Sequence, residues 1–144
     1  MQLKKAIFTK LGGEKTFGAP IKTELELTEA VRQGLPVRVV GLVFDGLRLT
    51  TGDMEHLVMP RRTLQRRIKH HQRLEPDESG RMVRVARVLT FADEVFGNPE
   101  KASRWLHKPK RNLNGQTPIE VLDTEEGARI IEDRLFAIAH GLTA

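Results

Sequence analysis

A run of cationic side chains between Arg61 and Arg73 is the clearest chemical signal in the sequence. Six residues of this run are Lys or Arg, and none is Asp or Glu. Such side chains neutralise phosphates and release the counterions condensed on nucleic acid, so binding would depend strongly on salt. Arginine and glutamine side chains also carry the donors that read guanine or adenine edges. The predicted DNA-contacting residues are Arg61, Arg62, Gln65, Arg66 and Lys69.

No catalytic or metal-binding pattern accompanies these residues. His70 and His71 are adjacent on a predicted helix, where their side chains diverge by about 100° and cannot form a ligand pair. Gly12 and Gly13 follow no convincing strand, so they do not form a nucleotide-binding fingerprint. His107 lies among cationic residues, and we expect it to be exposed. We therefore expect a binding protein without enzymatic activity, metal or cofactor.

Composition and charge favour a polyanionic partner. The chain has 144 residues, no cysteine and a formal net charge of +5, and its pI is about 9.9. The lack of cysteine excludes a disulfide framework and fits a reducing cytoplasm. No apolar run is long enough to span a membrane, and the first residues lack the apolar core of a signal peptide. We therefore expect a cytoplasmic protein that binds nucleic acid.

Two short helices are predicted to position the cationic run. Thr50 and Asp53 form a capping-box pattern that opens a helix ending at Leu57. Pro60 is well placed to open the next helix, which extends to about His71. Two short helices joined by a tight turn are typical of a helix-turn-helix, whose second helix enters the major groove.

The packing and the turn of this unit have two further features. Leu64 and Ile68 are four residues apart, so both are expected to point inward. Many such units have Gly in the turn, but Val58 stands there in this sequence. The turn must therefore form without a residue that adopts the left-handed conformation freely. The alternatives are a solvated basic helix, or one that binds an acidic protein.

The segments before this unit are predicted to be an arm and two helices. Residues 1–22 scatter their apolar residues without a period, so we expect a flexible arm with a short ordered piece near Ile7 and Phe8. A helix is predicted from Thr23, with Gly34 at its end. Residues 37–44 are apolar enough for a strand, but helix is preferred because no partner strand follows. The residues expected on the inner face of the first helix are Leu25, Ala30 or Val31, and Leu35.

The longest predicted helix extends from about Pro76 to Phe96. Its apolar stripe is wide, so we expect it to be the spine shared by both halves of the chain. Gly97 is expected to end it, and Asn98 to cap a short helix that follows. The stripe contains Met82, Val85, Ala86, Leu89, Ala92, Val95 and Phe96.

Residues 104–122 are predicted to form an ordered loop that is anchored at both ends. Trp105 is the only tryptophan, and its ring can anchor the loop against a core. Gly115 supplies a turn position with positive φ. Thr117 is expected to cap a short helix that starts at Pro118, with Glu120 completing a capping box. The predicted structural residues of the loop are Trp105, Pro109, Leu113, Gly115, Thr117 and Pro118.

The final helix is predicted to start after Asp123 as its cap and to end at Gly141. Ala128, Ile131, Leu135 and Ile138 are expected to face inward, whereas Ile130 and Phe136 lie to the side. The last three residues, 142–144, form a short tail.

From about Thr50 to Ala144, this pattern resembles the Xre/MbcA/ParS antitoxins. The run from Arg62 to Arg67 also resembles the Xre-like helix-turn-helix. The residues that carry the resemblance in the C-terminal half are Trp105, Leu106, Pro109, Leu113, Gly115, Thr117, Pro118, Leu122, Thr124, Gly127, Ala128, Glu132, Leu135, His140 and Gly141.

The resemblance implies an all-α protein that neutralises a RES-domain toxin, a class of toxin that consumes NAD. It implies that the C-terminal region enters the toxin's NAD pocket, while the helix-turn-helix binds operator DNA and represses the operon. The expected toxin-binding residues are Ile130, Arg134, Phe136, His140, Gly141, Leu142, Thr143 and Ala144.

The expected division is an arm at 1–22, a helix-turn-helix domain at 23–74 and a toxin-binding domain at 75–144. A homodimer is expected because helix-turn-helix proteins pair to match palindromic sites. One alternative is a stand-alone transcriptional regulator whose C-terminal half only dimerises. A third possibility is an adaptor whose basic face binds an acidic protein.

Overall fold

The computed structural model describes residues 7–17, 20–46 and 48–141. Within these ranges all regular secondary structure is helical, and the only β-type pairing is an isolated bridge between Pro36 and Arg73. This confirms the predicted all-α fold. No helix in the described part of the chain combines the length and apolar character needed to span a membrane.

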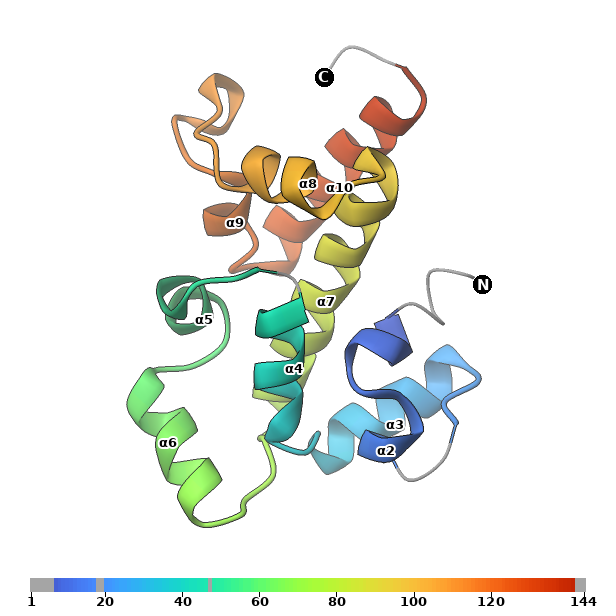
Figure 1. The fold of residues 1–144 in the computed structure, drawn as a ribbon, viewed down its shortest axis with the longest axis vertical. Helices are drawn as coiled ribbons and strands as arrows, with labels where there is room; N and C mark the ends of the chain where they lie inside the picture. Colours follow the sequence, from blue (N-terminus) through green and yellow to red (C-terminus); the bar gives the residue numbers. More distant parts are fainter. Residues whose placement is uncertain (1–6, 18–19, 47, 142–144) are drawn as a thin grey trace.

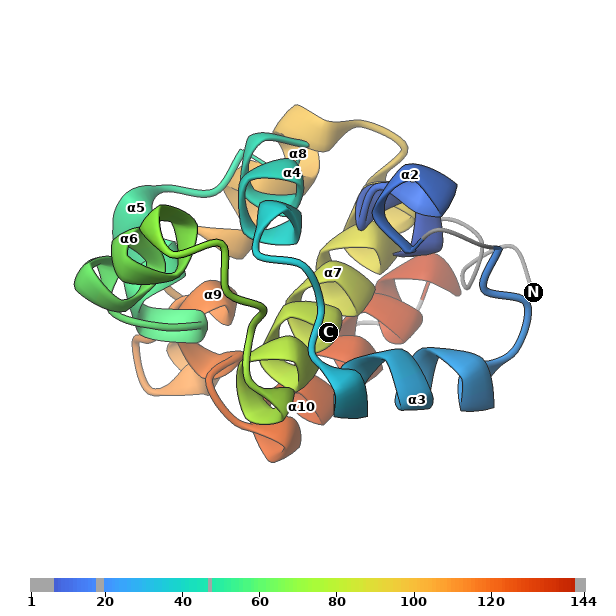
Figure 2. The ribbon, with the colours of Figure 1, turned by 90° about the horizontal axis from the view of Figure 1, so that it is seen from below.

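Helix α7 (Pro76–Phe96) is the spine of the molecule, as predicted. It passes through the middle of the fold in both views, with α10 (Glu125–Ala139) beside it (Figure 1 and Figure 2). It also packs on α3 (Glu24–Gln33), α4 (Arg38–Gly46) and α8 (Pro99–Leu106). Because neighbours surround it, its buried residues extend beyond the predicted stripe to Ser79, Val88 and Thr90.

The N-terminal region is more ordered than the predicted arm, in which only a short ordered piece near Ile7 and Phe8 was expected. Residues 7–10 are helical, α2 covers Gly13–Phe17, and Ile7 and Leu11 are buried in the core. These two residues are four apart, which places them on one helix face. The helical period was obscured because Gly12 and Gly13, both at positive φ, interrupt it. The remainder of the predicted arm at 1–6 and 18–19 lies outside the described residues.

Helices α3 and α4 confirm two predictions and correct one. Thr23 caps α3, Gly34 ends it, and residues 38–46 form a helix and not a strand. Leu25, however, is 72% exposed instead of facing inward. Leu27 and Ala30 pack against the core in its place, because residues three apart share a helix face.

The C-terminal half follows α7 through α8, the 3₁₀ turn η1 (Arg111–Leu113), α9 (Pro118–Val121) and α10. Thr124, and not the predicted Asp123, caps α10: its Oγ1 accepts from the Gly127 N–H at 2.9 Å. This start brings Gly127 against Val121, where a Cβ atom would collide with the Val121 carbonyl. The lack of a Cβ at Gly127 therefore allows α9 and α10 to approach closely at this cap.

Candidate functional site

Helices α5 (Thr51–Leu57) and α6 (Arg61–Lys69) form the predicted helix-turn-helix unit. The capping box is present, since Thr50 Oγ1 accepts from the Asp53 N–H and Asp53 Oδ2 accepts from the Thr50 N–H, both at 3.0 Å. Met54 and Leu57 bury their side chains beneath α5. In Figure 1, α6 lies at one end of the long axis of the molecule.

The turn between α5 and α6 forms without a left-handed residue. Val58 has φ −123° and ψ −64°, and its N–H donates to the Met54 carbonyl at 2.9 Å. Arg81 of α7 donates from Nε to the Val58 carbonyl at 2.8 Å. Val58 and Met59 are both buried. A side chain of the spine and apolar burial therefore hold the turn where many related units use glycine.

The predicted DNA-contacting side chains share one property: all are exposed on α6. They are Arg61, Arg62, Gln65, Arg66 and Lys69. Arg67 is the exception among the cations of α6, because it turns inward and donates to both carboxylate oxygens of Glu78 at 3.1 and 3.2 Å. This ion pair fixes how α6 is rotated on α7 and thereby directs the other cations to solvent.

Ile68 does not point inward as predicted. It is 54% exposed, whereas Leu64 is partly buried. Arg67 takes the position of α6 that faces α7, where it pairs with Glu78. Ile68 instead lines an apolar groove of about 480 Å³. The groove is formed by α4, α5 and α6, with Val40, Phe44 and Met54 among its lining residues.

The loop after α8 is ordered, as predicted. The centroids of the Trp105 and Phe96 rings lie 5.7 Å apart, and Lys110 Nζ lies over the Trp105 ring, 5.0 Å from its centroid. Leu113 and Pro118 are buried. Pro109 is exposed and does not anchor the loop, which corrects that part of the prediction.

Two left-handed residues and a cap complete this loop. Asn114 and Gly115 have φ values of 57° and 82°, a conformation that asparagine and glycine tolerate better than other residues. Thr117 caps α9 by accepting from the Glu120 N–H at 3.1 Å. The Glu120 carboxylate accepts from the Thr117 hydroxyl at 3.2 Å instead of from its backbone N–H.

The predicted toxin-binding residues on α10 occupy two separate lines of the helix. Ile130 and Arg134 are four residues apart on one line, and Phe136 and His140 are four apart on another. Ile130 is 45% and Phe136 55% exposed, as expected for residues off the core stripe. His140 Nδ1 donates to the Phe136 carbonyl at 2.9 Å, and Arg134 Nη2 donates to the Asn112 carbonyl at 3.0 Å.

The remaining predicted toxin-binding residues lie at the end of the chain. Gly141 follows α10 with φ 69°. Leu142, Thr143 and Ala144 lie outside the described residues.

His107 is not the exposed residue that the sequence predicted, because it is half-buried and hydrogen-bonded. Its Nε2 donates to Asp53 Oδ2 at 2.9 Å, and its Nδ1 donates to the Ser103 carbonyl at 2.8 Å. Burial disfavours the charged ring, but the hydrogen bonds to Asp53 and Ser103 and the charge of Asp53 outweigh it and raise the pKa of His107. With acceptors at both nitrogens, the site favours the doubly protonated imidazolium.

A second histidine connects the same two regions. His56 Nε2 of α5 donates to the Glu120 carbonyl of α9 at 2.8 Å and lies 3.8 Å from an Asp123 carboxylate oxygen. The helix-turn-helix is therefore attached to the C-terminal half by His56 as well as by His107. No local sequence signal could have revealed these contacts, because they join residues 64 and 54 positions apart.

Nothing in the described part of the chain groups three or more residues that could hold a metal ion.

Family models match both halves of the chain. The antitoxin Xre-like helix-turn-helix domain matches residues 26–87, and the antitoxin Xre/MbcA/ParS C-terminal toxin-binding domain matches residues 91–141. The first match ends and the second begins within α7.

Curated relatives agree with these models. An Antitoxin Xre of Photorhabdus laumondii is 31% identical over 132 residues, which cover 90% of this chain and 89% of that protein. An Antitoxin Xre of Pseudomonas putida is 44% identical over 84 residues, but these span only 58% of this chain and 53% of that protein. A Sphingobium protein named Prs ADP-ribosylating antitoxin is 28% identical over 112 residues, which cover 72% of this chain and 64% of that protein. With a helix-turn-helix at one end and the toxin-binding type of domain at the other, the chain belongs to the Xre/MbcA/ParS antitoxin family.

Proposed function

We propose that this chain neutralises a RES-domain toxin that consumes NAD, and that it does so by covering the toxin's active site with its C-terminal region. The observation that carries the proposal is the match of residues 91–141 to a toxin-binding domain. The proposed contact residues on α10 are Ile130, Arg134, Phe136 and His140, followed by Gly141 and residues 142–144. In this role the chain acts by binding and not as an enzyme.

Two features of α10 support this proposal. Ile130 and Phe136 present apolar side chains to solvent, where they offer a partner apolar contact area. The helix itself is firmly held, because Ala128, Ile131 and Leu135 are fully buried and Arg87 of α7 pairs with Glu132 at 3.2 Å. A rigid helix that presents its exposed residues loses little conformational freedom on binding.

We also propose that α6 binds operator DNA and represses the operon of the chain. The exposed cations of α6 support this role, since a helix-turn-helix presents its second helix to the major groove. Binding of palindromic DNA would use two copies of the chain, so the proposed active form is a homodimer. Light scattering of the purified protein measures this state, and a monomer at working concentration would contradict the dimer.

The test of the toxin-binding role uses the product of the reading frame adjacent to this gene. NAD consumption by that protein is measured with the intact chain, with a chain lacking residues 142–144, and with Phe136→Ala. We expect the intact chain to stop NAD consumption and each variant to need about tenfold more protein for the same inhibition. Operator binding, measured by gel shift, is expected to stay the same in all three.

Three results would contradict the proposal in different ways. A truncated chain that inhibits as well as the intact one would exclude the role of the final residues. A neighbouring protein that the chain binds but that consumes no NAD would exclude the toxin class. A chain that binds its operator but not the neighbouring protein would instead support a stand-alone transcriptional regulator.

A further inference from the structure

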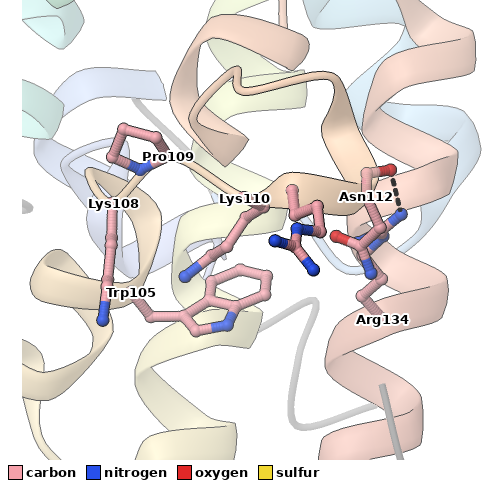
Figure 3. A pocket seen from close by; sticks show the side chains of 7 residues that line it. Trp105, Lys108, Pro109, Lys110, Asn112 and Arg134 are labelled. Atoms are coloured by element: carbon pink, nitrogen blue, oxygen red, sulfur yellow. Dashed lines mark hydrogen bonds between the residues drawn. The ribbon is translucent and has the colours of Figure 1, made fainter.

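A pocket of about 430 Å³ lies between the end of α8, the loop that follows it and α10 (Figure 3). We call it the Trp105 pocket. Four of its lining side chains are cationic, and none is a carboxylate. These cations are Lys108, Lys110, Arg111 and Arg134, and Trp105 and Asn112 also line the pocket. So many like charges around one concavity create a strongly positive local potential.

The cations of the Trp105 pocket are not neutralised within the described part of the chain. None of the four forms an ion pair with a described carboxylate, whereas Arg84 and Arg87 of α7 both pair with Glu125. Burial and the charge of Lys108 lower the pKa of Lys110. An anion in the pocket would relieve this repulsion between like charges.

The pocket is also held in shape before any ligand binds. Lys110 donates its backbone N–H to the Gln116 carbonyl at 3.0 Å and accepts from the Gly115 N–H at 2.9 Å, which closes the loop. The dashed line in Figure 3 marks the hydrogen bond from Arg134 to the Asn112 carbonyl, which attaches the loop to α10. Such preorganisation lowers the entropy lost when a ligand is bound.

The position of the Trp105 pocket in the fold distinguishes between two sources of the anion, the phosphates of DNA and the carboxylates of a protein. The loop of the Trp105 pocket and α6 lie at opposite ends of the long axis (Figure 1). DNA lying along α6 is therefore remote from the pocket of the same chain. Arg134 belongs to α10, and all the lining residues fall within the stretch that matches a toxin-binding domain. These placements favour an anion supplied by a protein.

We infer that the Trp105 pocket receives Asp or Glu side chains of the protein partner bound by the C-terminal region. The inference rests on the proposed toxin-binding role and adds a second contact to it, beside the apolar residues of α10. Arginine can bind a carboxylate through two parallel hydrogen bonds, and the lysines add point charges. The loop is thus a binding element as well as a structural one.

The experiment compares two charge-reversed proteins with the unmodified chain. The pocket variant is Lys108→Glu with Arg111→Glu, and both positions are exposed. The matched control is Lys22→Glu with Lys101→Glu, which makes the same change in net charge at exposed positions outside both the pocket and the proposed contact residues of α10. Calorimetry measures the dissociation constant for the neighbouring gene's product in low and high salt, and gel shifts measure operator binding.

For the pocket variant we expect the dissociation constant to rise about 30-fold in low salt, with a smaller difference in high salt because salt screens exposed charges. The control is expected to stay within about threefold of the unmodified chain. Circular dichroism checks folding, and a milder variant, Lys108→Gln with Arg111→Gln, is expected to give an intermediate loss.

The outcomes separate this inference from the proposed function. If the unmodified chain does not bind the neighbouring protein, both are overturned. If it binds and the pocket variant binds equally well, only the pocket inference is overturned. A pocket variant that keeps the protein partner but loses operator DNA would show that the pocket serves nucleic acid instead.

Discussion

The α6 face and the Trp105 pocket present cations in opposite ways. On α6 the exposed cations project outward from a convex helix, whereas in the pocket four cations line a single concavity. A row of outward charges suits an extended polyanion, and convergent charges suit a compact anion. The difference teaches that net charge alone does not identify the partner, since the curvature of the surface selects the shape of the anion.

Both regions are attached to α7 by arginine. Arg67 of α6 pairs with Glu78 of α7, with side chains that are only 11% and 8% exposed. At the other end Arg87 of α7 pairs with Glu125 and Glu132, and all three of these side chains are at least 30% exposed. The ion pair that holds α6 on α7 is thus more deeply buried than the ion pairs between α7 and α10.

The largest expected effect is on stability, and it compares the ion pair that holds α6 with the one that holds α10. Glu78→Ala removes the buried partner of Arg67 and the acceptor of the Glu75 N–H, and leaves Arg67 only the exposed carboxylate of Glu75 at 3.9 Å, so we expect a loss of about 3 kcal/mol in the free energy of unfolding. The matched change Glu132→Ala leaves Arg87 paired with Glu125, so a loss below about 1 kcal/mol is expected. Urea denaturation followed by circular dichroism measures both, and equal losses would show that burial does not distinguish the two ends.

An intermediate effect tests the cations themselves. Arg62→Ala with Arg66→Ala is expected to weaken operator binding by roughly 2 kcal/mol and to reduce the slope of log affinity against log salt by about two. The control, Lys108→Ala with Arg111→Ala, removes the same charge from the pocket and is expected to leave operator binding nearly unchanged. Gel shifts over a salt series make the comparison. Equal weakening by both variants would mean that net charge, and not its placement on α6, determines binding.

The smallest expected effect concerns the contact between the two regions. The pKa of His107 is raised above its ordinary value of 6.5 by Asp53 and Ser103, against the opposing effect of burial. A raised pKa in the folded state contributes stability below the unfolded pKa, and this stability is lost as pH rises through the folded pKa.

The protein should therefore become less stable, by less than about 1 kcal/mol, between about pH 6 and 8. His107→Gln is expected to reduce this pH dependence in thermal unfolding, whereas the exposed His70→Gln is not. Parallel pH profiles for the unmodified chain and His107→Gln would rule out the contribution of this histidine.

Local sequence signals predicted most of the fold. The predicted start at Thr23, the caps at Thr50, Asn98 and Thr117 and the end at Gly97 gave helix boundaries, because each signal acts through neighbouring residues only. The all-α class and the family followed from the same helix pattern and from the residues around Trp105.

The prediction errors arose where tertiary contacts determine whether a side chain is buried or exposed. Ile68 was expected to be buried, but Arg67 takes the inward position because Glu78 of another helix pairs with it. His107 was expected to be exposed, and Asp53 cannot be identified as its partner from spacing. Leu11 was placed in an arm, although the core of the folded chain buries it completely.

Of the two candidate sites, one was predictable from local sequence and the other was not. The exposure of Arg61, Arg62, Arg66 and Lys69 was predictable from the helical pattern of α6, whereas the burial of Arg67 was not. The Trp105 pocket was not, since it forms only when Arg134 of α10 reaches the Asn112 carbonyl of the loop.

Because both halves pack on α7, their unfolding and degradation are coupled. Val85, Ala86 and Leu89 of this helix belong to one core cluster that also contains Met54 of the helix-turn-helix and Ile131 of α10. Unfolding of either half removes packing partners from the other, so neither is expected to survive alone. A protease that unfolds one region would therefore inactivate both together, and the bound partners would be released in a single event.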